Sequence, residues 1–167
     1  IRKLSKTNVT KYFEELFQPR TINISSVDEL SKIGMHPHYH SWDNYQLSCD
    51  IDGSNGTTIQ PLILTGSFNG NGYAIRNLNI SYNGVDQNVE KVELLGLFKI
   101  VSSFQPIAIQ DLTIENINIS AVPTSANAAV LASYLASSIK NCKIMKCRIT
   151  GEAEIAGIVA FRIVPAI

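Results

Sequence analysis

The sequence predicts an all-β protein, a parallel β-helix (solenoid) of about three to four coils with a short N-terminal helical cap. This prediction depends on composition and on two apolar landmarks that recur in step. Among 167 residues there are 22 Ile and 14 Asn. Ile favours strands because it is branched at its β carbon, and Asn favours tight turns. A chain rich in both residue types is expected to form many short strands separated by many corners.

The first landmark is an apolar pattern with steps of three, two, three and two residues, which runs in full from Ile109 and from Ile139 and over its first two steps from Ile75. A step of two keeps side chains on one face of a strand. A step of three breaks this alternation, as a corner or a bulge would, and then restores inward pointing. Because Ile-x-Ile doublets do not fit a period of 3.6 residues, the pattern indicates strands and not a helix.

Aligning the three copies makes their corner and core positions equivalent. The predicted corner residues are Asn77, Asp111 and Asn141, and the predicted core residues that follow them are Leu78, Leu112 and Cys142. The spacing is 34 residues from Leu78 to Leu112 and 30 residues from Leu112 to Cys142. Stacked Asn side chains at such a corner can hydrogen-bond from coil to coil.

The second landmark is a small residue inside an apolar run, at Gly96, Ala129 and Gly157, with spacings of 33 and 28 residues. One coil cannot bury its apolar face alone, whereas stacked coils share a continuous core. A β-sandwich is the alternative, but it needs two-residue hairpin turns, which are few here. Loops of variable length are expected at residues 83–91, at residues 121–127 and around Pro106.

Three regions are expected along the chain. They are residues 1–20, a helical segment or upstream tail; residues 21–44, a cap made of a strand, a helix and a loop; and residues 45–167, the coils. In the cap, Ser26 and Glu29 have the spacing of a helix N-terminal capping box, and Gly34 is the expected C-terminal stop. The helix should therefore be about two turns long.

The chain contains the phrase G-x-F-x-G-x-G-Y-x-I-x-N-L at residues 66–78 and Leu-Gly-Leu-Phe at residues 95–98. Together with residues 45–52, these stretches resemble the GLUG-motif repeat proteins. Members of that family are β-helical segments of bacterial surface adhesins, autotransporter-like passengers and the non-catalytic parts of large secreted proteases. The likeness covers most of the chain, from about residue 21 to about residue 163.

Two positions depart from the family motif. Lys99 stands at its second glycine in the first copy, and Ala129 replaces its first glycine in the second copy. The resemblance implies a right-handed coil and a structural or adhesive role in a protein that is secreted or exposed on a bacterial surface. It does not imply catalysis.

The sequence contains only a weak signal for a metal site. His36, His38 and His40 would share one face if their stretch were extended, and three imidazoles can bind zinc or nickel. The favoured interpretation is a Pro-containing surface loop, and no metal or cofactor is expected. Residues 50–56 are interpreted as a strand end followed by an Asx turn, because the twelfth position of a calcium loop would be Pro61.

No catalytic residue is predicted, because the acids of the coils are sparse and every His precedes the coils. Cys49, Cys142 and Cys147 are interpreted as free thiols that pack as small hydrophobic residues, with a Cys142–Cys147 pair as the alternative. A net charge of +0 with 17% charged residues does not indicate the basic surface that nucleic-acid binding requires. No apolar run reaches the roughly 18 residues of a membrane span.

The favoured function is a non-catalytic scaffold or adhesion module of a larger surface or secreted protein, which binds a partner protein or a glycan at a host or cell surface. One alternative is a carbohydrate-binding or polysaccharide-degrading β-helix, and another is an accessory segment of a secreted protease or effector. Aromatic platforms for a glycan would come from Tyr39, Trp42, Tyr45, Tyr73 and Tyr82. The apolar residues 161–167 predict that the C-terminal coil is continued by further chain or covered by a partner.

Overall fold

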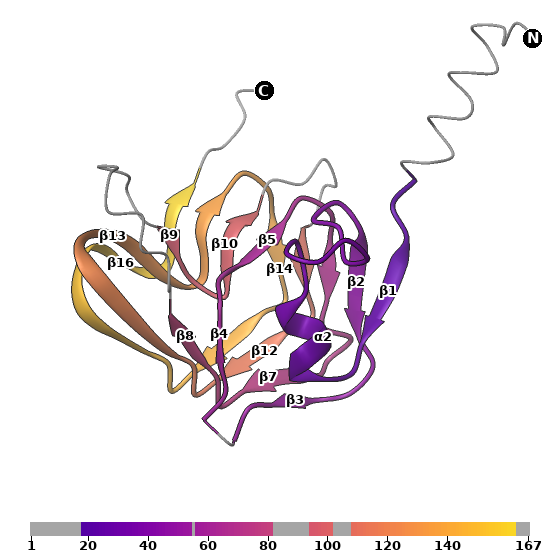
Figure 1. Ribbon diagram of the computed structural model, residues 1–167, viewed down its shortest axis with the longest axis horizontal. Helices are drawn as coiled ribbons and strands as arrows, with labels where there is room; N and C mark the ends of the chain where they lie inside the picture. The colour runs from indigo at the N-terminus through magenta and orange to yellow at the C-terminus, as the bar shows by residue number, and fades with distance from the viewer. Residues whose placement is uncertain (1–17, 55, 82–93, 102–107, 163–167) are drawn as a thin grey trace, which may run out of the picture.

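Parallel β-strands dominate the computed structural model, which describes residues 18–54, 56–81, 94–101 and 108–162 (Figure 1). The predicted all-β class is confirmed, and the arrangement is compatible with a parallel solenoid. Residues 1–17, which contain most of the predicted N-terminal helical segment, lie outside the described residues. The helix that is described, α2 (Val27–Ser31), belongs to the region predicted as a cap.

The described strands form three sheets in which all pairs of neighbours are parallel. Sheet 1 consists of β1 (Thr21–Ile24), β2 (Asn44–Leu47), β6 (Phe68–Asn69), β11 (Ile109–Gln110) and β14 (Ile139–Lys140). Sheet 2 consists of β3 (Ile51–Asp52), β7 (Ala74–Arg76), β12 (Thr113–Glu115) and β15 (Lys143–Met145). Sheet 3 consists of β4 (Thr58–Ile59), β5 (Leu62–Leu64), β8 (Asn79–Ser81), β9 (Leu94–Leu95), β10 (Phe98–Val101), β13 (Asn118–Leu135) and β16 (Arg148–Arg162).

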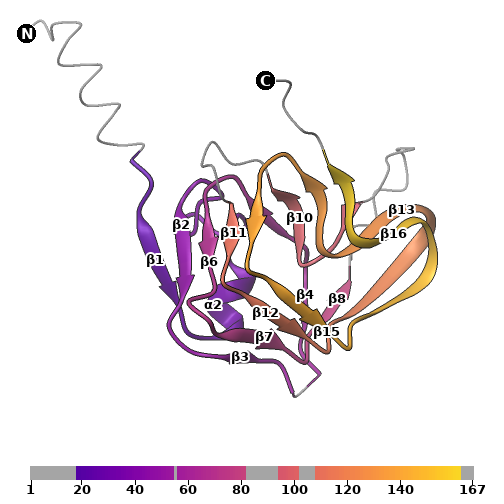
Figure 2. The same cartoon turned by 180° about the vertical axis from the view of Figure 1, so that it is seen from behind.

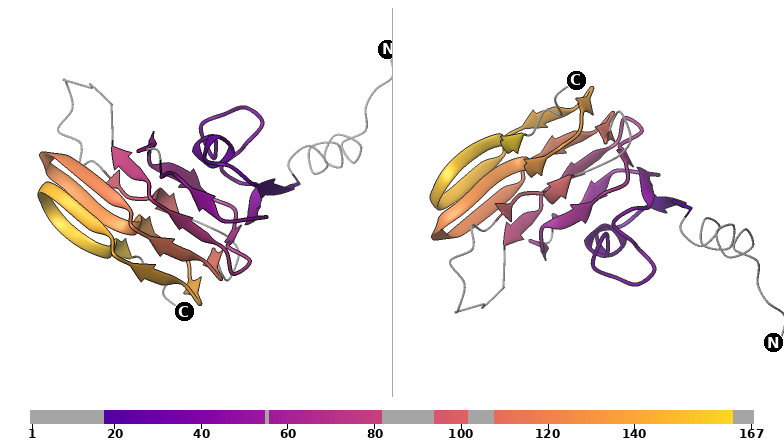
Figure 3. Two further views of the ribbon diagram at one scale, coloured as in Figure 1. Left: turned by 90° about the horizontal axis from the view of Figure 1, so that it is seen from below. Right: turned by 90° about the horizontal axis from the view of Figure 1, so that it is seen from above.

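Within the described residues the chain passes through sheets 1, 2 and 3 in the same order four times. We call these passes the first coil (β2–β5), second coil (β6–β10), third coil (β11–β13) and fourth coil (β14–β16). Seen from behind, the strands of the successive coils lie side by side (Figure 2). Seen from below and above, α2 lies at one end of this stack and β16 at the other (Figure 3).

Each sheet contributes a column of inward aliphatic or aromatic side chains to one core. In sheet 2 the column is Ile51, Ile75, Ile114 and Ile144, which are register partners from coil to coil. The first three members are at most 1% exposed. Full burial of such a side chain contributes roughly 1.5–3 kcal/mol, so these columns hold the coils together.

The predicted alignment of Leu78 with Leu112 in the next coil is wrong by five residues. Ile75 pairs with Ile114, and the N–H of Asn118 donates to the carbonyl of Leu78 over 2.9 Å, so Leu78 is level with Ile117 and not with Leu112. The cause is that the third coil repeats its own Ile-x-(Asn/Asp)-(Leu/Ile)-x pattern after five residues. Two alignments therefore look equally good, and only the strand pairing distinguishes them.

The predicted levels of Leu112 with Cys142, and of Gly96 with Ala129 and Gly157, are confirmed. Lys143 donates its N–H to the carbonyl of Leu112 over 2.9 Å, which places Cys142 level with Leu112. In the second landmark Ala129 pairs with Gly157, and a Cβ on Gly96 would lie 2.6 Å from the carbonyl oxygen of Ala129. The close approach of two backbones explains the glycine at position 96.

The predicted corner residues are corners, but Asn77 does not share its corner with Asp111 and Asn141. Asn77 is level with Asn116, whose Nδ2 donates to Asn77 Oδ1, whereas Asn141 Nδ2 donates to Asp111 Oδ1. The backbone at the three predicted corner residues is left-handed, with φ of 58° at Asn77, 51° at Asp111 and 50° at Asn141. Asn116 and Lys146 form equivalent left-handed corners with φ of 52° and 53°. Asn and Asp tolerate this conformation better than other non-glycine residues, which explains why Asn is abundant.

Two predicted features of the connections are corrected. Residues 121–127 do not form a loop, because they lie inside β13, whose register against β16 shifts between Ala121 and Ala126. The additional residues are therefore absorbed as a bulge within the strand. The loops predicted at residues 83–91 and around Pro106 fall outside the described residues.

The helix α2 begins where the sequence indicates. The hydroxyl of Ser26 accepts from the N–H of Glu29 over 3.2 Å, and the Glu29 carboxylate accepts from the N–H of Ser25 over 2.8 Å. The helix ends at Ser31, three residues before Gly34, and is shorter than the predicted two turns. Gly34 follows the end of the helix with a left-handed φ of 72°, as expected of a C-terminal stop, and a Cβ there would also lie 2.5 Å from the carbonyl oxygen of Ile63.

Candidate interaction surface on the fourth coil

The inward side chains of the fourth coil are less buried than those of the third coil. Ile139, Cys142, Ile144, Cys147 and Ile149 are only half-buried, although they pack against the core. Their counterparts are at most 1% exposed: Ile109, Leu112, Ile114, Ile117 and Ile119. The reason is that no described strand lies beyond β14 and β15, which end their sheets.

The backbone of the fourth coil is open on the same side. β14 pairs with β11, and β15 pairs with β12, so each has one neighbour among the described strands. β16 pairs with β13, and its Ile158 is 58% exposed. Strands at the edge of a sheet present N–H and C=O groups that another strand can pair with. The fourth coil therefore combines half-covered aliphatic side chains with free backbone groups.

The outward side chains of the first part of this coil, from β14 to the start of β16, are strongly basic. Residues 139–149 carry four cations, Lys140, Lys143, Lys146 and Arg148, and no acid. All four of these side chains are exposed. The corresponding residues 109–119 of the third coil carry Asp111 and Glu115 and no base. These two equivalent stretches of neighbouring coils thus have the same inward pattern and opposite outward charge.

The two coils interact through these charges at the corners. Lys146 Nζ lies 3.1 Å from Glu115 Oε1, and Asn141 Nδ2 donates to Asp111 Oδ1 over 2.6 Å. Lys140, Lys143 and Arg148 form no ion pair with a described residue. Most of the positive charge of the fourth coil is therefore not compensated within the described part of the chain.

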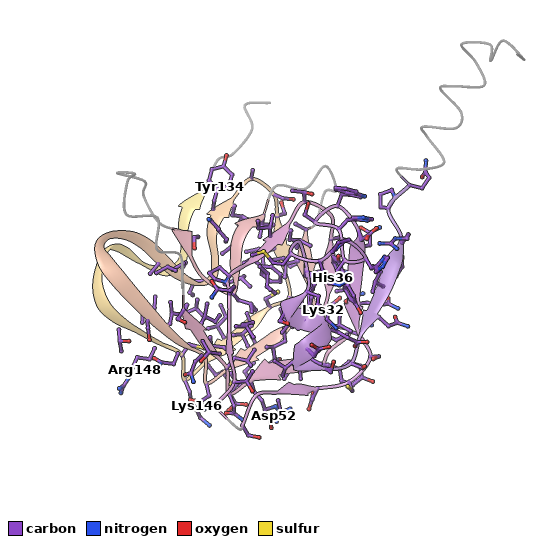
Figure 4. The ribbon with its side chains drawn as sticks, viewed as in Figure 1. Lys32, His36, Asp52, Tyr134, Lys146 and Arg148 are labelled. Carbon is purple, nitrogen blue, oxygen red and sulfur yellow. The ribbon has the colours of Figure 1, made fainter. Side chains whose placement is uncertain are left out.

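A polar groove lies at the corner between sheets 2 and 3. It has a volume of about 350 Å³ and is lined by Asn116, Ile117, Asn118, Lys146, Arg148 and Thr150. Lys146 and Arg148 are on the same side of the molecule in Figure 4. Within the described residues the buried amide oxygen of Asn118 accepts no hydrogen bond. Such a groove, with two cations and polar side chains, suits a carboxylate better than an apolar ligand.

The three predicted metal-ligand candidates do not converge. The rings of His36 and His38 are 5.5 Å apart, whereas the ring of His40 stacks on Trp42 at 4.4 Å. The Nδ1 atom of His40 faces Asp43 Oδ2 at 3.3 Å. Among the described residues, no group of three His, Cys, Asp or Glu side chains could hold a metal ion.

The buried carboxylate of Asp43 is a feature that sequence reasoning missed. Its side chain is 1% exposed, pairs with Arg20 Nη2 at 2.5 Å and accepts from the backbone N–H groups of Arg20 and His40. Burial raises the pKa of the Asp43 carboxyl, but the hydrogen bonds and charge of Arg20 outweigh it and hold the pKa below its usual range. The partners are 23 residues apart, so no local pattern indicates the pair.

The cysteines behave as the sequence suggests. Cys49, Cys142 and Cys147 are free and half-buried. Burial raises the pKa of the Cys142 and Cys147 thiols, so they remain protonated and pack as small hydrophobic groups. The Asx turn after β3 is also present, because the N–H of Ser54 donates to Asp52 Oδ1 over 2.9 Å.

One predicted aromatic platform is wrong. Tyr45 is 1% exposed, and its hydroxyl donates to the carbonyl of His40 over 2.6 Å, so no glycan can stack on it. Trp42 and Tyr73 are 40% and 39% exposed. Tyr82 lies outside the described residues.

Comparison with known proteins gives no relative to argue from. No family model, no curated protein and no solved structure matches the chain. None of the described helices has the length and apolar character needed to cross a membrane. The function must therefore be argued from the fourth coil and its charges.

Proposed function

We propose that the chain is a non-catalytic scaffold or adhesion module of a larger secreted or surface-exposed bacterial protein. In this proposal the strands form a right-handed parallel β-helix, and residues 21–44 cap one end of it. The fourth coil is the binding end of the stack, and further chain or a partner covers it. The observation that carries the proposal is the half-buried inward column of that coil, next to a column that is fully buried in the third coil.

The free energy of the uncovered column supports this function. Removing apolar surface from water stabilises by roughly 25 cal/mol per Å². Ile144 and Cys147 leave part of this stabilisation unrealised, because nothing described lies over them. An added strand would cover these side chains and satisfy the backbone groups of β14 and β15 at the same time.

A protein partner is favoured over a glycan. Another strand is the best partner for a row of free backbone N–H and C=O groups. It would lie about 4.7–4.9 Å away and form hydrogen bonds with them. A glycan would instead need aromatic platforms, and of the five predicted, Tyr45 is buried. Trp42 remains exposed but stacks on His40 and lies far from the fourth coil in the sequence.

Hydrogen exchange on the whole chain tests the proposal. The amides of β14 and β15 should exchange much faster than those of β11 and β12, which have neighbours on both sides. Partner capture would then slow the exchange of β14 and β15 selectively. Equal protection of the third and fourth coils in the free protein would show that the end is not open, and the proposal would fail.

A further inference from the structure

The outward charges of sheet 2 and its corners alternate in sign from coil to coil. Residues 45–59 of the first coil contain Asp50 and Asp52 and no base, and residues 68–81 of the second coil contain Arg76 and no acid. The third coil carries acids at this level and the fourth carries bases, as described above. The signs are therefore negative, positive, negative and positive.

The register brings these opposite charges together. Asp52, Arg76 and Glu115 are successive register partners across β3, β7 and β12. Arg76 also forms an ion pair with Asp50, and Lys146 pairs with Glu115 at 3.1 Å. Opposite charges on neighbouring strands contribute roughly 0.2–1 kcal/mol, and like charges destabilise. A coil that follows the fourth would continue the alternation only if it were acidic.

We propose that the fourth coil docks a parallel β-strand segment with acidic outward residues and aliphatic inward residues at steps of three and two. This inference rests on the proposed function, because it assumes that the fourth coil is open, and it names the chemistry of the partner. The third coil shows how the contact would look, since Glu115 already places a carboxylate against Lys146.

Three features of the fourth coil point to one occupant. An acidic strand pairs with the free backbone edge, covers Ile144 and its neighbours, and neutralises Lys140, Lys143 and Arg148. An acidic polysaccharide would meet only the cations. A second copy that presents its own residues 139–149 would oppose four cations with four cations, which electrostatic repulsion disfavours.

The chain itself supplies the probe for a test. A labelled peptide of residues 108–119 carries the inward pattern of the third coil together with Asp111 and Glu115. The matched control is the same peptide with Asp111→Lys and Glu115→Lys, which keeps the apolar residues and reverses the charge. Binding of each peptide to the full chain is measured by fluorescence anisotropy at several salt concentrations, with hydrogen exchange to locate the bound strand.

The acidic peptide should bind more tightly than the basic control, on the order of tenfold, because two attractive contacts become repulsive. Added salt should reduce the difference, and bound peptide should protect β14 and β15 from exchange. The protein variant Lys140→Glu with Lys143→Glu should reverse the preference. Because both residues are exposed and form no ion pair with a described residue, this variant should keep the unfolding transition of the parent.

Several results would overturn the inference. They are equal binding of both peptides, no binding at millimolar concentration, protection elsewhere than the fourth coil, or stronger binding of a carboxylated polysaccharide without strand protection. Dimers of the peptide-free chain in light scattering would instead indicate a second copy. If β14 and β15 are already protected in the free chain, the proposed function fails; if they exchange rapidly and the peptides are not discriminated, only the partner chemistry fails.

Discussion

The two ends of the strand stack differ in how the apolar core is closed. At the end near α2, Leu30 and Ile33 are fully buried, and Gly34 packs against the backbone of Ile63. At the other end, Ile144 and Cys147 are half-exposed. The comparison teaches that an inward repeat does not guarantee burial in a stacked fold, because each coil is buried by its neighbours. A separate element has to end the column.

Removing a side chain at the α2 end should have the largest effect on stability. Leu30→Ala leaves a cavity in a fully buried site and should lower the free energy of unfolding by about 2–5 kcal/mol. The matched substitution at the open end, Ile144→Ala, should cost clearly less, because that site is half-exposed and can be reached by water. Urea unfolding of both variants checks the difference, and equal losses would remove the distinction between the two ends.

Asp43 should rank next, because its carboxylate holds β1 to the loop before β2. Asp43→Ala leaves the backbone N–H groups of Arg20 and His40 without their acceptor and should cost about 1–3 kcal/mol. Asp28→Ala is the control, since the Asp28 side chain is 75% exposed and its pair with Lys32 lies on the surface. A loss as large in the control would contradict the importance of burial.

The same carboxylate predicts a dependence on pH. The pKa of Asp43 is lower in the folded chain than in the unfolded chain, where it is about 3.9. Its stabilisation is therefore complete above the unfolded pKa and is lost as the pH falls through the folded pKa. The difference in unfolding free energy between the parent and Asp43→Ala should be constant at neutral pH and shrink on acidification below about pH 4. A difference that grows on acidification would contradict this assignment.

The corners should show a smaller effect. Asn116 has φ of 52° and donates through Nδ2 to Asn77 Oδ1 over 2.6 Å. Asn116→Ala should cost about 1–2 kcal/mol, because Ala is less tolerant of the left-handed region and the side-chain hydrogen bond is lost. Asn116→Gly loses the same hydrogen bond without the strain and should cost less. Thermal unfolding distinguishes the two variants, and equal costs would mean that the left-handed backbone is not what selects Asn.

The ion pair between the third and fourth coils should contribute least. Lys146 is 76% exposed at its side chain, so a double-mutant cycle with Glu115→Gln and Lys146→Met should give a coupling of about 0–1 kcal/mol that decreases in salt. A coupling of several kcal/mol would mean that the fourth coil is shielded from water and is not an open end.

The sequence predicts the strands and corners well because both are local. Ile doublets fix which side chains face inward, and Asn or Asp at the left-handed positions fixes where the strands end, as at Asp111 and Asn141. The level of Leu78 could not be predicted, because the pattern repeats within a coil at five residues as well as between coils. Only hydrogen bonds between strands decide between those registers.

The candidate surface was only partly visible in the sequence. Four cations without an acid in residues 139–149 are a signal that could have been noticed. Their meaning depends on knowing that Arg76 lies beside Glu115 and that Lys146 reaches the same carboxylate. The Arg20–Asp43 pair is likewise a tertiary contact, since its burial depends on how β1 pairs with β2. The strand register decides which charged side chains become neighbours, and the register depends on the packing of all the coils.

Cross-strand contacts between backbone protons, observed by nuclear magnetic resonance, test the stacking most directly. They should connect Asn79 with Asn118 and Ile114 with Ile144, because these residues are register partners in neighbouring coils. Contacts that instead place Leu78 beside Leu112 would contradict the stacking and the charge alternation that depends on it.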